Sequence, residues 1–239
     1  MFKLSIIIPA YNEEKYLPAC LAAFGQAISV CTSLTVSEII VVDNASTDRT
    51  AEIAEAAGAI VVSEPERKIS KVRNAGARAA TGDYLLFIDA DTVIAESALA
   101  EVGRVLEKGN CIGGGAYVRY DVGGMVAIAA WFINHVVARM GRAWGTFLFC
   151  ERDAFQEIGG FDETLYGMEE LVFSEALKKT AKSRRKKFRI IPKYLAVTSG
   201  RRIKGQLKQL IRQPKVLLNP KKHMTNPDIC RPVWYDQGR

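Results

Sequence analysis

Two aspartates separated by one residue, Asp89 and Asp91, are the side chains whose types and spacing most directly suggest chemistry. They follow a run of five largely apolar residues, 84–88, which is entered from Thr81-Gly82-Asp83. Such a run predicts a strand buried on both faces, and buried charge is costly, so we expect the carboxylates at the strand's carboxyl end. Open α/β sheets bind their ligands at that edge. Two hard oxygen ligands there suit Mg2+ or Mn2+, although the same aspartates also fit a solvated turn.

The elements that must position these aspartates alternate along the first half of the chain. We expect strands at residues 4–9, 38–43, 59–63 and 84–88, and helices at 15–29, 48–57, 71–80 and 96–108. This alternation predicts an α/β fold with a mostly parallel sheet covered by helices. The second half is less regular, with strands expected at 111–121 and 188–197 and helices at 152–158 and 167–179. We divide the chain into residues 1–110, residues 111–200 and a basic tail, 201–239.

The composition is that of an ordinary soluble globular protein, with 239 residues, 49% hydrophobic and 25% charged. The five cysteines are odd in number and show no Cys-x-x-Cys spacing, which favours a reducing compartment. The amino terminus is broken by Pro9 too soon to form a signal peptide. We therefore expect a cytoplasmic protein, with the inner face of a membrane as its alternative location.

The net charge of +7 is distributed unevenly. Residues 1–120 contain 11 basic and 15 acidic residues, whereas residues 121–239 contain 22 and 11. The basic half could face nucleic acid, an anionic membrane or a phosphorylated substrate, but its basic residues lack the interleaved aromatics of a nucleic-acid binder, so no nucleic acid is expected. The apolar stretch from Met125 to Met140 is shorter than the roughly 20 residues of a spanning helix. It predicts either a core helix or a helix that lies on a membrane or acceptor.

Three expected strands end in polar residues, at 9–13, 43–48 and 89–91. In a parallel sheet these ends are neighbours, so their side chains could share one ligand. A nucleotide across them could stack on Tyr11, hydrogen-bond Glu13 and Asp43, and pass its diphosphate to a metal on Asp91. Arg73 or Lys71 could add positive charge.

These segments resemble the family 2 glycosyltransferases of GT-A fold. The resemblance rests on Ser5-Ile-Ile-Ile-Pro-Ala-Tyr-Asn-Glu-Glu14, Val41-Val-Asp-Asn-Ala-Ser-Thr-Asp-Arg-Thr50, Arg73-Asn-Ala-Gly76 and Asp89-Ala-Asp91. It continues through an Arg-x-x-Phe-x-x-x-Gly-Gly-Phe pattern ending at Phe161 and reaches Glu169-Glu170, so it covers residues 3 to about 200. It implies an inverting enzyme with a nucleotide-sugar donor and a Mn2+ or Mg2+ ion. It implies that residues 1–110 bind the nucleotide-sugar donor. Residues 111–200, the other half of the same domain, would bind the acceptor and supply the catalytic base.

The resemblance also implies roles for single residues on the donor side. Tyr11, Glu13 and Asp43, with Pro9 beside them, match nucleoside-binding positions. Arg73 matches a position near the base or phosphates. Asp89 matches a ribose contact and a possible second metal ligand, while Asp91 matches the carboxylate that binds the divalent cation. Ser199-Gly-Arg-Arg202 resembles a basic element whose Arg201 and Arg202 could clamp the diphosphate, although a solvated basic segment explains it equally well.

On the acceptor side, Glu169-Glu170 matches the family's Glu-Asp motif, which supplies the general base. Glu170 stands at the Asp position but reaches about one methylene further, so Glu169 remains an alternative base. Both also fit the acidic first turn that any helix favours. His223 is conceivable as a third metal ligand, but a surface histidine explains it better. Thr146 departs from the family, where an acidic residue often faces the acceptor.

Other functions fit the sequence less well. A sugar-phosphate nucleotidyltransferase usually needs a glycine-rich basic loop where this chain has Tyr11-Asn-Glu-Glu14. A Rossmann dehydrogenase would need Gly-x-Gly-x-x-Gly after the first strand. A non-enzymatic protein that binds nucleic acid or an anionic surface would use residues 178–189 and the tail. The favoured interpretation is transfer of a sugar to the hydroxyl of a glycan or lipid-linked acceptor.

Overall fold

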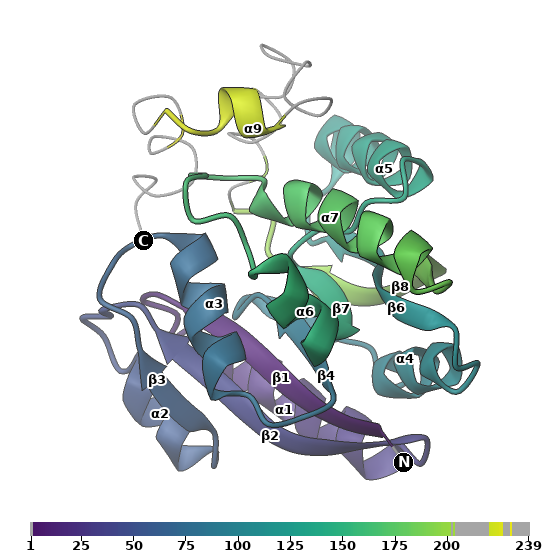
Figure 1. Cartoon of the computed structure of the whole chain (residues 1–239). Coiled ribbons are helices and arrows are strands. Elements are labelled where there is room, and N and C mark those ends of the chain that lie inside the picture. Colours follow the sequence, from purple (N-terminus) through teal and green to yellow (C-terminus); the bar gives the residue numbers. More distant parts are fainter. Residues whose placement is uncertain (1, 202, 204–219, 227–229, 231–239) are drawn as a thin grey trace.

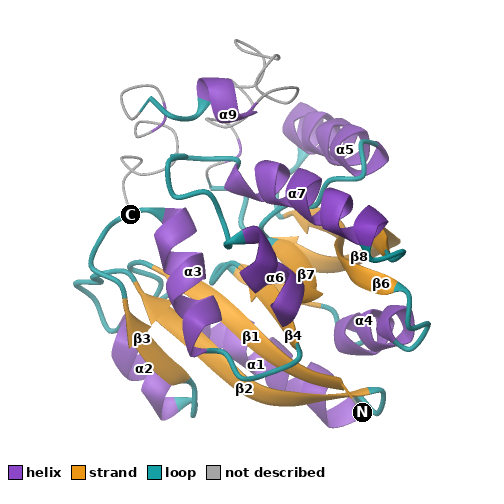
Figure 2. Ribbon diagram, viewed as in Figure 1, coloured by secondary structure: helices purple, strands orange, loops and turns teal. Residues whose placement is uncertain are grey.

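A single eight-stranded sheet organises the chain, with the strand order β3-β2-β1-β4-β7-β6-β8-β5 (Figures 1 and 2). The structure is a computed structural model that describes residues 2–201, 203, 220–226 and 230. The strands are β1 (Phe2–Ala10), β2 (Leu34–Asp43), β3 (Ile60–Ser63), β4 (Tyr84–Ile88), β5 (Thr92–Ile94), β6 (Cys111–Tyr120), β7 (Phe147–Glu151) and β8 (Lys187–Thr198). The helices are α1 (Leu17–Val30), α2 (Thr50–Ala56), α3 (Ile69–Ala79), α4 (Ala98–Leu106), α5 (Gly124–Arg139), α6 (Arg152–Ile158), α7 (Glu169–Ser183) and α9 (Pro220–His223).

The first half forms the parallel part of the sheet. β1 pairs in parallel with both β2 and β4, and β2 pairs in parallel with β3. The register places Ala10 beside Asp43 and Ile7 beside Phe87, so these strands end at the same edge. The prediction of an α/β fold with a mostly parallel sheet is therefore confirmed.

The second half adds antiparallel pairs that the sequence did not reveal. β7 runs antiparallel to both β4 and β6, and β8 runs parallel to β6. β5 pairs antiparallel with β8, joining Thr92 to Thr198, and was not predicted because three residues are too short for a clear strand pattern.

Alternating side chains of the strands fill two cores, one on each face of the sheet. Ile6 and Ile8 of β1 point to the face covered by α1, α2 and α4, whereas Ile7 points to the face covered by α3, α6 and α7 (Figure 2). This follows from the two-residue period of a strand, and burial on both faces explains the unbroken apolar runs of the sequence.

One glycine allows β6 to lie close to β8. A Cβ atom added at Gly114 would lie 1.7 Å from the backbone oxygen of Arg189, which is far inside van der Waals contact. The glycine at position 114 is therefore required by the close pairing of β6 with β8.

Helix α5 covers β6 at the outer side of the molecule, next to α7 (Figure 1). Asn134 on its inner side donates a hydrogen bond to the backbone oxygen of Val118 at 2.6 Å. Only Ala130, Asn134 and Val137 of this helix are buried. Within the described residues, no helix has the length and hydropathy needed to cross a bilayer.

Candidate active site

A cavity of about 200 Å³ lies where the carboxyl ends of β1, β4 and β8 meet α3, α5 and α7. Its walls combine the loop after β1, the Asp89–Asp91 turn and the first turn of α7. It thus collects residues from Pro9 to Ile203, and the parallel register of β1 and β4 brings the first two of these segments together. The lining side chains discussed below are Pro9, Tyr11, Glu13, Arg73, Asp89, Asp91, Tyr120, Asn134, Trp144, Thr146, Met168, Glu169, Glu170, Thr198 and Arg201.

Asp89 and Asp91 occupy a tight turn between β4 and β5, where the backbone N–H of Thr92 donates to the backbone carbonyl oxygen of Asp89 at 3.1 Å. The Asp89 carboxylate accepts from Arg73 Nη2 at 3.0 Å and from Thr146 Oγ1 at 3.0 Å. The neutral Thr146, which departs from the family pattern, therefore orients an aspartate of the pocket.

The Asp91 carboxylate contacts different partners. It accepts from Thr198 Oγ1 at 3.2 Å, and it forms an ion pair with Arg201 Nη2 at 3.0 Å. The same Arg201 nitrogen pairs with Glu13 Oε1 at 2.5 Å. Arg201 therefore bridges two carboxylates that come from the loops after β1 and β4.

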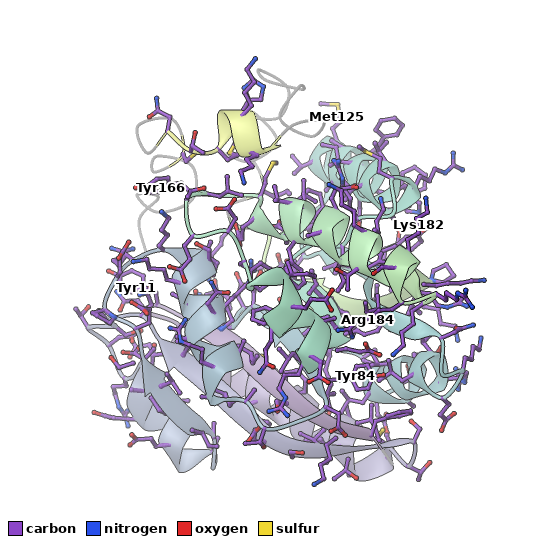
Figure 3. The ribbon with its side chains drawn as sticks, viewed as in Figure 1. Tyr11, Tyr84, Met125, Tyr166, Lys182 and Arg184 are labelled. Carbon is purple, nitrogen blue, oxygen red and sulfur yellow. The ribbon has the colours of Figure 1, made fainter. Side chains whose placement is uncertain are left out.

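Hydrogen bonds join the loop after β1 to the loop after β2. Asn12 accepts from the backbone N–H of Thr47 at 2.8 Å, and the Glu13 N–H donates to Thr50 Oγ1 at 2.8 Å. The Tyr11 ring, labelled in Figure 3, lies beside the Arg67 guanidinium, which is 3.6 Å from the ring centre. These contacts connect the ends of β1 and β2, as expected for neighbouring parallel strands.

Arg73 on α3 is the central cation of the pocket. It is buried and contacts Asp89 on one side and Glu169 on the other. Although burial opposes the charge, Glu169 and Asp89 raise the pKa of Arg73, so it stays protonated. The close packing of Gly145 supports this position, because a Cβ there would lie 2.3 Å from Arg73 Nη2.

The two glutamates at the start of α7 differ in their environment. Burial raises the pKa of Glu169, while its ion pair with Arg73 favours the charged form. Burial, followed by the charge of Glu169, raises the pKa of Glu170 to about 8. Among the described residues no ion pair is formed by Glu170. A carboxyl group with a pKa near the working pH can exchange a proton with a substrate.

The backbone before α7 aims these glutamates inward. Met168, the residue before the helix, adopts the left-handed conformation with φ 57° and ψ 23°. This conformation is unfavourable for a residue with a side chain and is held here by burial of Met168 against Leu165 and Leu171. The turn it produces lets both Glu169 and Glu170 face the pocket.

The structure brings most of the predicted site residues into this one cavity. Nine line it: Pro9, Tyr11, Glu13, Arg73, Asp89, Asp91, Glu169, Glu170 and Arg201. Asp43 lies at the end of β2 beside Ala10 but does not line the cavity, and its carboxylate accepts from the Ser46 N–H at 3.3 Å. Arg202 lies outside the described residues, as does most of the predicted basic tail. The roles of these residues stay predictions.

Sequence reasoning missed several lining residues. Thr198 is the last residue of β8, Tyr120 is the last residue of β6, and Asn134 lies on α5. All three reach the pocket only through the folding of the second half of the chain. Trp144 also lines it, and its buried Nε1 has no hydrogen-bond partner among the described residues. A threonine or tyrosine at a strand end was the only available signal. His223 lies in α9 and does not line the cavity.

Two carboxylates of the pocket could hold a divalent cation. Asp89 and Asp91 lie in one turn, and across the described residues no group of three or more His, Cys, Asp or Glu side chains has metal-binding geometry. Mg2+ typically binds through one or two carboxylates together with substrate phosphates and waters. The two carboxylates therefore fit a cation that binds together with a phosphorylated ligand, provided that Arg201 leaves Asp91.

Comparisons with known proteins agree with this geometry. The sequence model of glycosyl transferase family 2 matches residues 5–158. Over 114 residues the chain is 32% identical to the poly(ribitol-phosphate) β-N-acetylglucosaminyltransferase TarS of Staphylococcus aureus, which covers 45% of this chain but 19% of that protein. Over 106 residues it is 37% identical to an uncharacterized glycosyltransferase of Mycobacterium tuberculosis, 44% of each chain. The chain thus spans less than half the length of these relatives.

Solved structures show the same fold. Residues 1–349 of Staphylococcus aureus TarS in complex with UDP-GlcNAc superpose with a TM-score of 0.67 at 19% identity, covering 87% of this chain and 65% of that chain. The mannosyltransferase of Pyrobaculum calidifontis in complex with GDP-Man and Mn2+ gives a TM-score of 0.66 at 19% identity, covering 97% and 67%. Since the family model covers well over half of the chain and the fold is that of its members, this protein belongs to glycosyl transferase family 2 and has the GT-A fold.

Proposed function

We propose that this chain transfers a sugar from a nucleoside diphosphate sugar to an acceptor hydroxyl, in one displacement with inversion at the anomeric carbon. The observation that carries the proposal is that Asp91 and Glu170, from opposite halves of the chain, line the same cavity. An inverting transfer needs a group that holds the leaving diphosphate and a base that faces it across the sugar. The complexes of similar structures with UDP-GlcNAc and GDP-Man support a nucleotide-sugar donor.

The donor side is formed by the loops after β1, β2 and β4. Tyr11, Glu13 and Pro9 would contact the nucleoside, with Asp43 behind them at the end of β2. Arg73 and Asp89, already joined by an ion pair, would contact the phosphates and ribose. Ligand pockets typically have volumes of about 300–1,000 Å³. Because the present cavity holds about 200 Å³, we expect donor binding to displace Arg201 from Glu13 and Asp91.

A divalent cation, Mn2+ or Mg2+, would be held by Asp91, with Asp89 as its second carboxylate, and would stabilise the leaving diphosphate as a Lewis acid. Thr198 and Thr146 orient these two carboxylates through hydrogen bonds of 3.2 Å and 3.0 Å. Arg201, once displaced, would lie beside the phosphates, and Arg202 follows it in the sequence. The Mn2+ complex of the Pyrobaculum calidifontis mannosyltransferase supports this assignment.

Glu170 is the general base in this proposal. Its pKa of about 8 gives it an appreciable charged fraction near neutral pH and a strong affinity for the acceptor proton. Glu169 is less suited, because its carboxylate is bound to Arg73. Glu169 would instead keep Arg73 in place and raise the proton affinity of Glu170.

The acceptor side is formed by β6, α5 and the loop before β7. We propose a hydroxyl of a lipid-linked or cell-envelope glycan, used in the cytoplasm at the inner face of the membrane. The support for this is the apolar helix α5, whose Ala130, Ile133 and Asn134 line the cavity. The five cysteines, all free thiols, fit a reducing compartment.

The test is a thermal-shift screen of nucleoside diphosphates and their sugars with and without Mn2+, using wild type, Asp91→Ala, Glu170→Gln and the control Asp153→Asn at an exposed position of α6. We expect one nucleotide to stabilise wild type and the control only when Mn2+ is present, and Asp91→Ala to lose this effect.

Glu170→Gln should keep the stabilisation but lower the rate of transfer by about 10²–10⁴-fold, the usual contribution of a general base. Metal-dependent stabilisation that survives in Asp91→Ala would refute the role of Asp91. Full transfer activity in Glu170→Gln would refute the role of Glu170.

A further inference from the structure

Helix α5 exposes a stripe of large apolar side chains. Met125 is 85% exposed, Ile128 68%, Trp131 53% and Phe132 62%. Residues 125, 128 and 132 are three and four positions apart, so they lie along one face of the helix, with residue 131 beside them. Figure 3 shows Met125 projecting outward at the edge of the molecule. We call these four residues the α5 stripe.

Apolar side chains on α5 are distributed in the reverse way to those of an ordinary surface helix. Its buried positions are the small or polar residues Ala130 and Asn134, together with Val137, whereas the bulkiest apolar side chains face outward. A globular surface helix normally places its apolar face inward. Contiguous exposed apolar surface of this kind is typical of a site that contacts a partner or a membrane.

The stripe lies beside the candidate active site. Ala130 and Ile133, on the inner side of the same helix, line the catalytic cavity. A second cavity, of about 330 Å³, shares Tyr120 and Ala130 with the first and extends to Trp131 of the stripe and to Tyr194 of β8. An apolar surface on this helix is therefore continuous with the acceptor side of the pocket.

All charged side chains within the segment that carries the stripe, residues 122–150, are basic, and the exposed Asp121 precedes it. No acidic residue occurs from Val122 to Cys150. Arg139 is exposed in the last turn of α5, and the exposed Arg119 lies 5.1 Å from the ring centre of Tyr194, next to the second cavity. Apolar side chains bordered by arginines, with a tryptophan among them, are the pattern of a helix that lies in the interface of an anionic bilayer.

We propose that the α5 stripe docks the protein on an anionic lipid bilayer. Met125, Ile128, Trp131 and Phe132 enter the boundary between headgroups and acyl chains, while Arg119 and Arg139 contact the lipid phosphates. The second cavity then opens at the lipid surface and leads a lipid-borne acceptor to Glu170, a consequence that rests on the proposed function.

A second copy of the chain is a poorer occupant of this surface. Two copies that paired through the stripe would place the exposed Arg119 and Arg139 of both chains at one interface, to which the 122–150 segment contributes no acidic residue. Like charges brought together in this way disfavour association. A bilayer needs no complementary shape, and its anionic headgroups neutralise both arginines.

The experiment is flotation of the full chain with phosphatidylcholine vesicles that contain or lack phosphatidylglycerol. The variants are Ile128→Ser/Phe132→Ser, Arg139→Gln and the matched control Ile60→Ser/Val93→Ser, whose residues are also exposed but lie on β3 and β5. We expect wild type and the control to float with the anionic vesicles only. The stripe double variant should bind at least about tenfold more weakly, and Arg139→Gln should show an intermediate loss.

A second readout follows Trp131 directly. Vesicles with brominated acyl chains should quench the tryptophan fluorescence of wild type, and Trp131→Phe should lose most of this quenching. Wild type that fails to float, or a stripe variant that floats as well as the control, would overturn the proposal. A wild-type dimer in sedimentation velocity that the stripe variant converts to a monomer would also overturn it, in favour of a second copy.

Nucleotide stabilisation of the stripe variant separates this inference from the function. If the variant keeps metal-dependent stabilisation but loses flotation, both proposals stand. If wild type floats but no nucleotide stabilises it, the docking surface stands and the proposed donor chemistry fails.

Discussion

The raised pKa of Glu170 predicts an unusual dependence of stability on pH that can be measured without any substrate. The pKa of this carboxyl group is 4.5 ordinarily and about 8 in the folded protein, chiefly because the group is buried and secondly because Glu169 lies beside it. Between these two values the folded chain keeps a proton that the unfolded chain has lost. The contribution of Glu170 to the free energy of unfolding therefore falls by about 1.4 kcal/mol for each pH unit in this interval.

Replacing Glu170 by Gln removes this proton while nearly preserving the shape of the side chain. Relative to wild type, Glu170→Gln should become progressively more stable as the pH rises from 4.5 to 8, reaching a difference of about 5 kcal/mol, and the difference should stay constant above that range. The stabilisation arises because ionising the buried carboxyl group costs desolvation energy. The neutral amide of glutamine does not ionise and avoids this cost.

The assay is urea denaturation of both proteins at several pH values, with Glu175→Gln on the same helix as the control. Burial opposes ionisation of Glu175 too, but hydrogen bonds from Arg142 and Lys178 lower its pKa. A lowered pKa contributes stability that is present above the unfolded pKa and is lost in acid, so this control should be less stable than wild type at neutral pH. Parallel stability curves for wild type and Glu170→Gln would refute the reasoning, because Glu170 would then be charged in the folded protein.

Three further predictions test the surroundings of the site. Arg73→Gln should destabilise the protein by about 3–5 kcal/mol in urea denaturation, because it leaves the buried Glu169 unpaired; a loss below about 1 kcal/mol would mean that the ion pair contributes little. Trp144→Phe should raise the KM for the acceptor about five- to tenfold with kcat nearly unchanged, since it removes the buried Nε1–H, while the smaller ring should also lower stability by about 1 kcal/mol; an unchanged KM would place Trp144 away from the acceptor. Gly114→Ala should cost about 1–3 kcal/mol or prevent folding because its Cβ would meet the Arg189 backbone, whereas Gly123→Ala, which has open space around it, should be nearly neutral by the same measurement.

The part of the site formed by the loops after β1, β2 and β4, the proposed donor side, could be predicted from sequence because it follows directly from local patterns. Each apolar run ends in a polar loop, and parallel pairing alone requires that the loops after β1, β2 and β4 lie together. The strand at 84–88 was predicted with its observed bounds, and Asp89 and Asp91 lie at its carboxyl end as expected.

The proposed acceptor side could not be predicted in the same way. The position of Glu169 depends on Arg73, which is 96 residues earlier in the chain, and on the left-handed conformation of Met168. The antiparallel pairs of β7 and β5 bring Thr146 and Thr198 to the aspartates. These contacts arise between distant segments and have no local period that a sequence pattern could reveal.

The two arginines of the pocket explain how so many carboxylates can share one small cavity. Arg201 joins Glu13 to Asp91, and Arg73 joins Asp89 to Glu169, so four of the five acidic side chains have a cationic partner. Glu170 forms no ion pair within the described residues, and its pKa is raised accordingly. A divalent cation that binds Asp91 must compete with Arg201, whereas Arg73 is buried between its partners and can stay in place. Donor and metal should therefore bind together, because the diphosphate offers the displaced Arg201 a new anionic partner while the metal replaces its charge at Asp91.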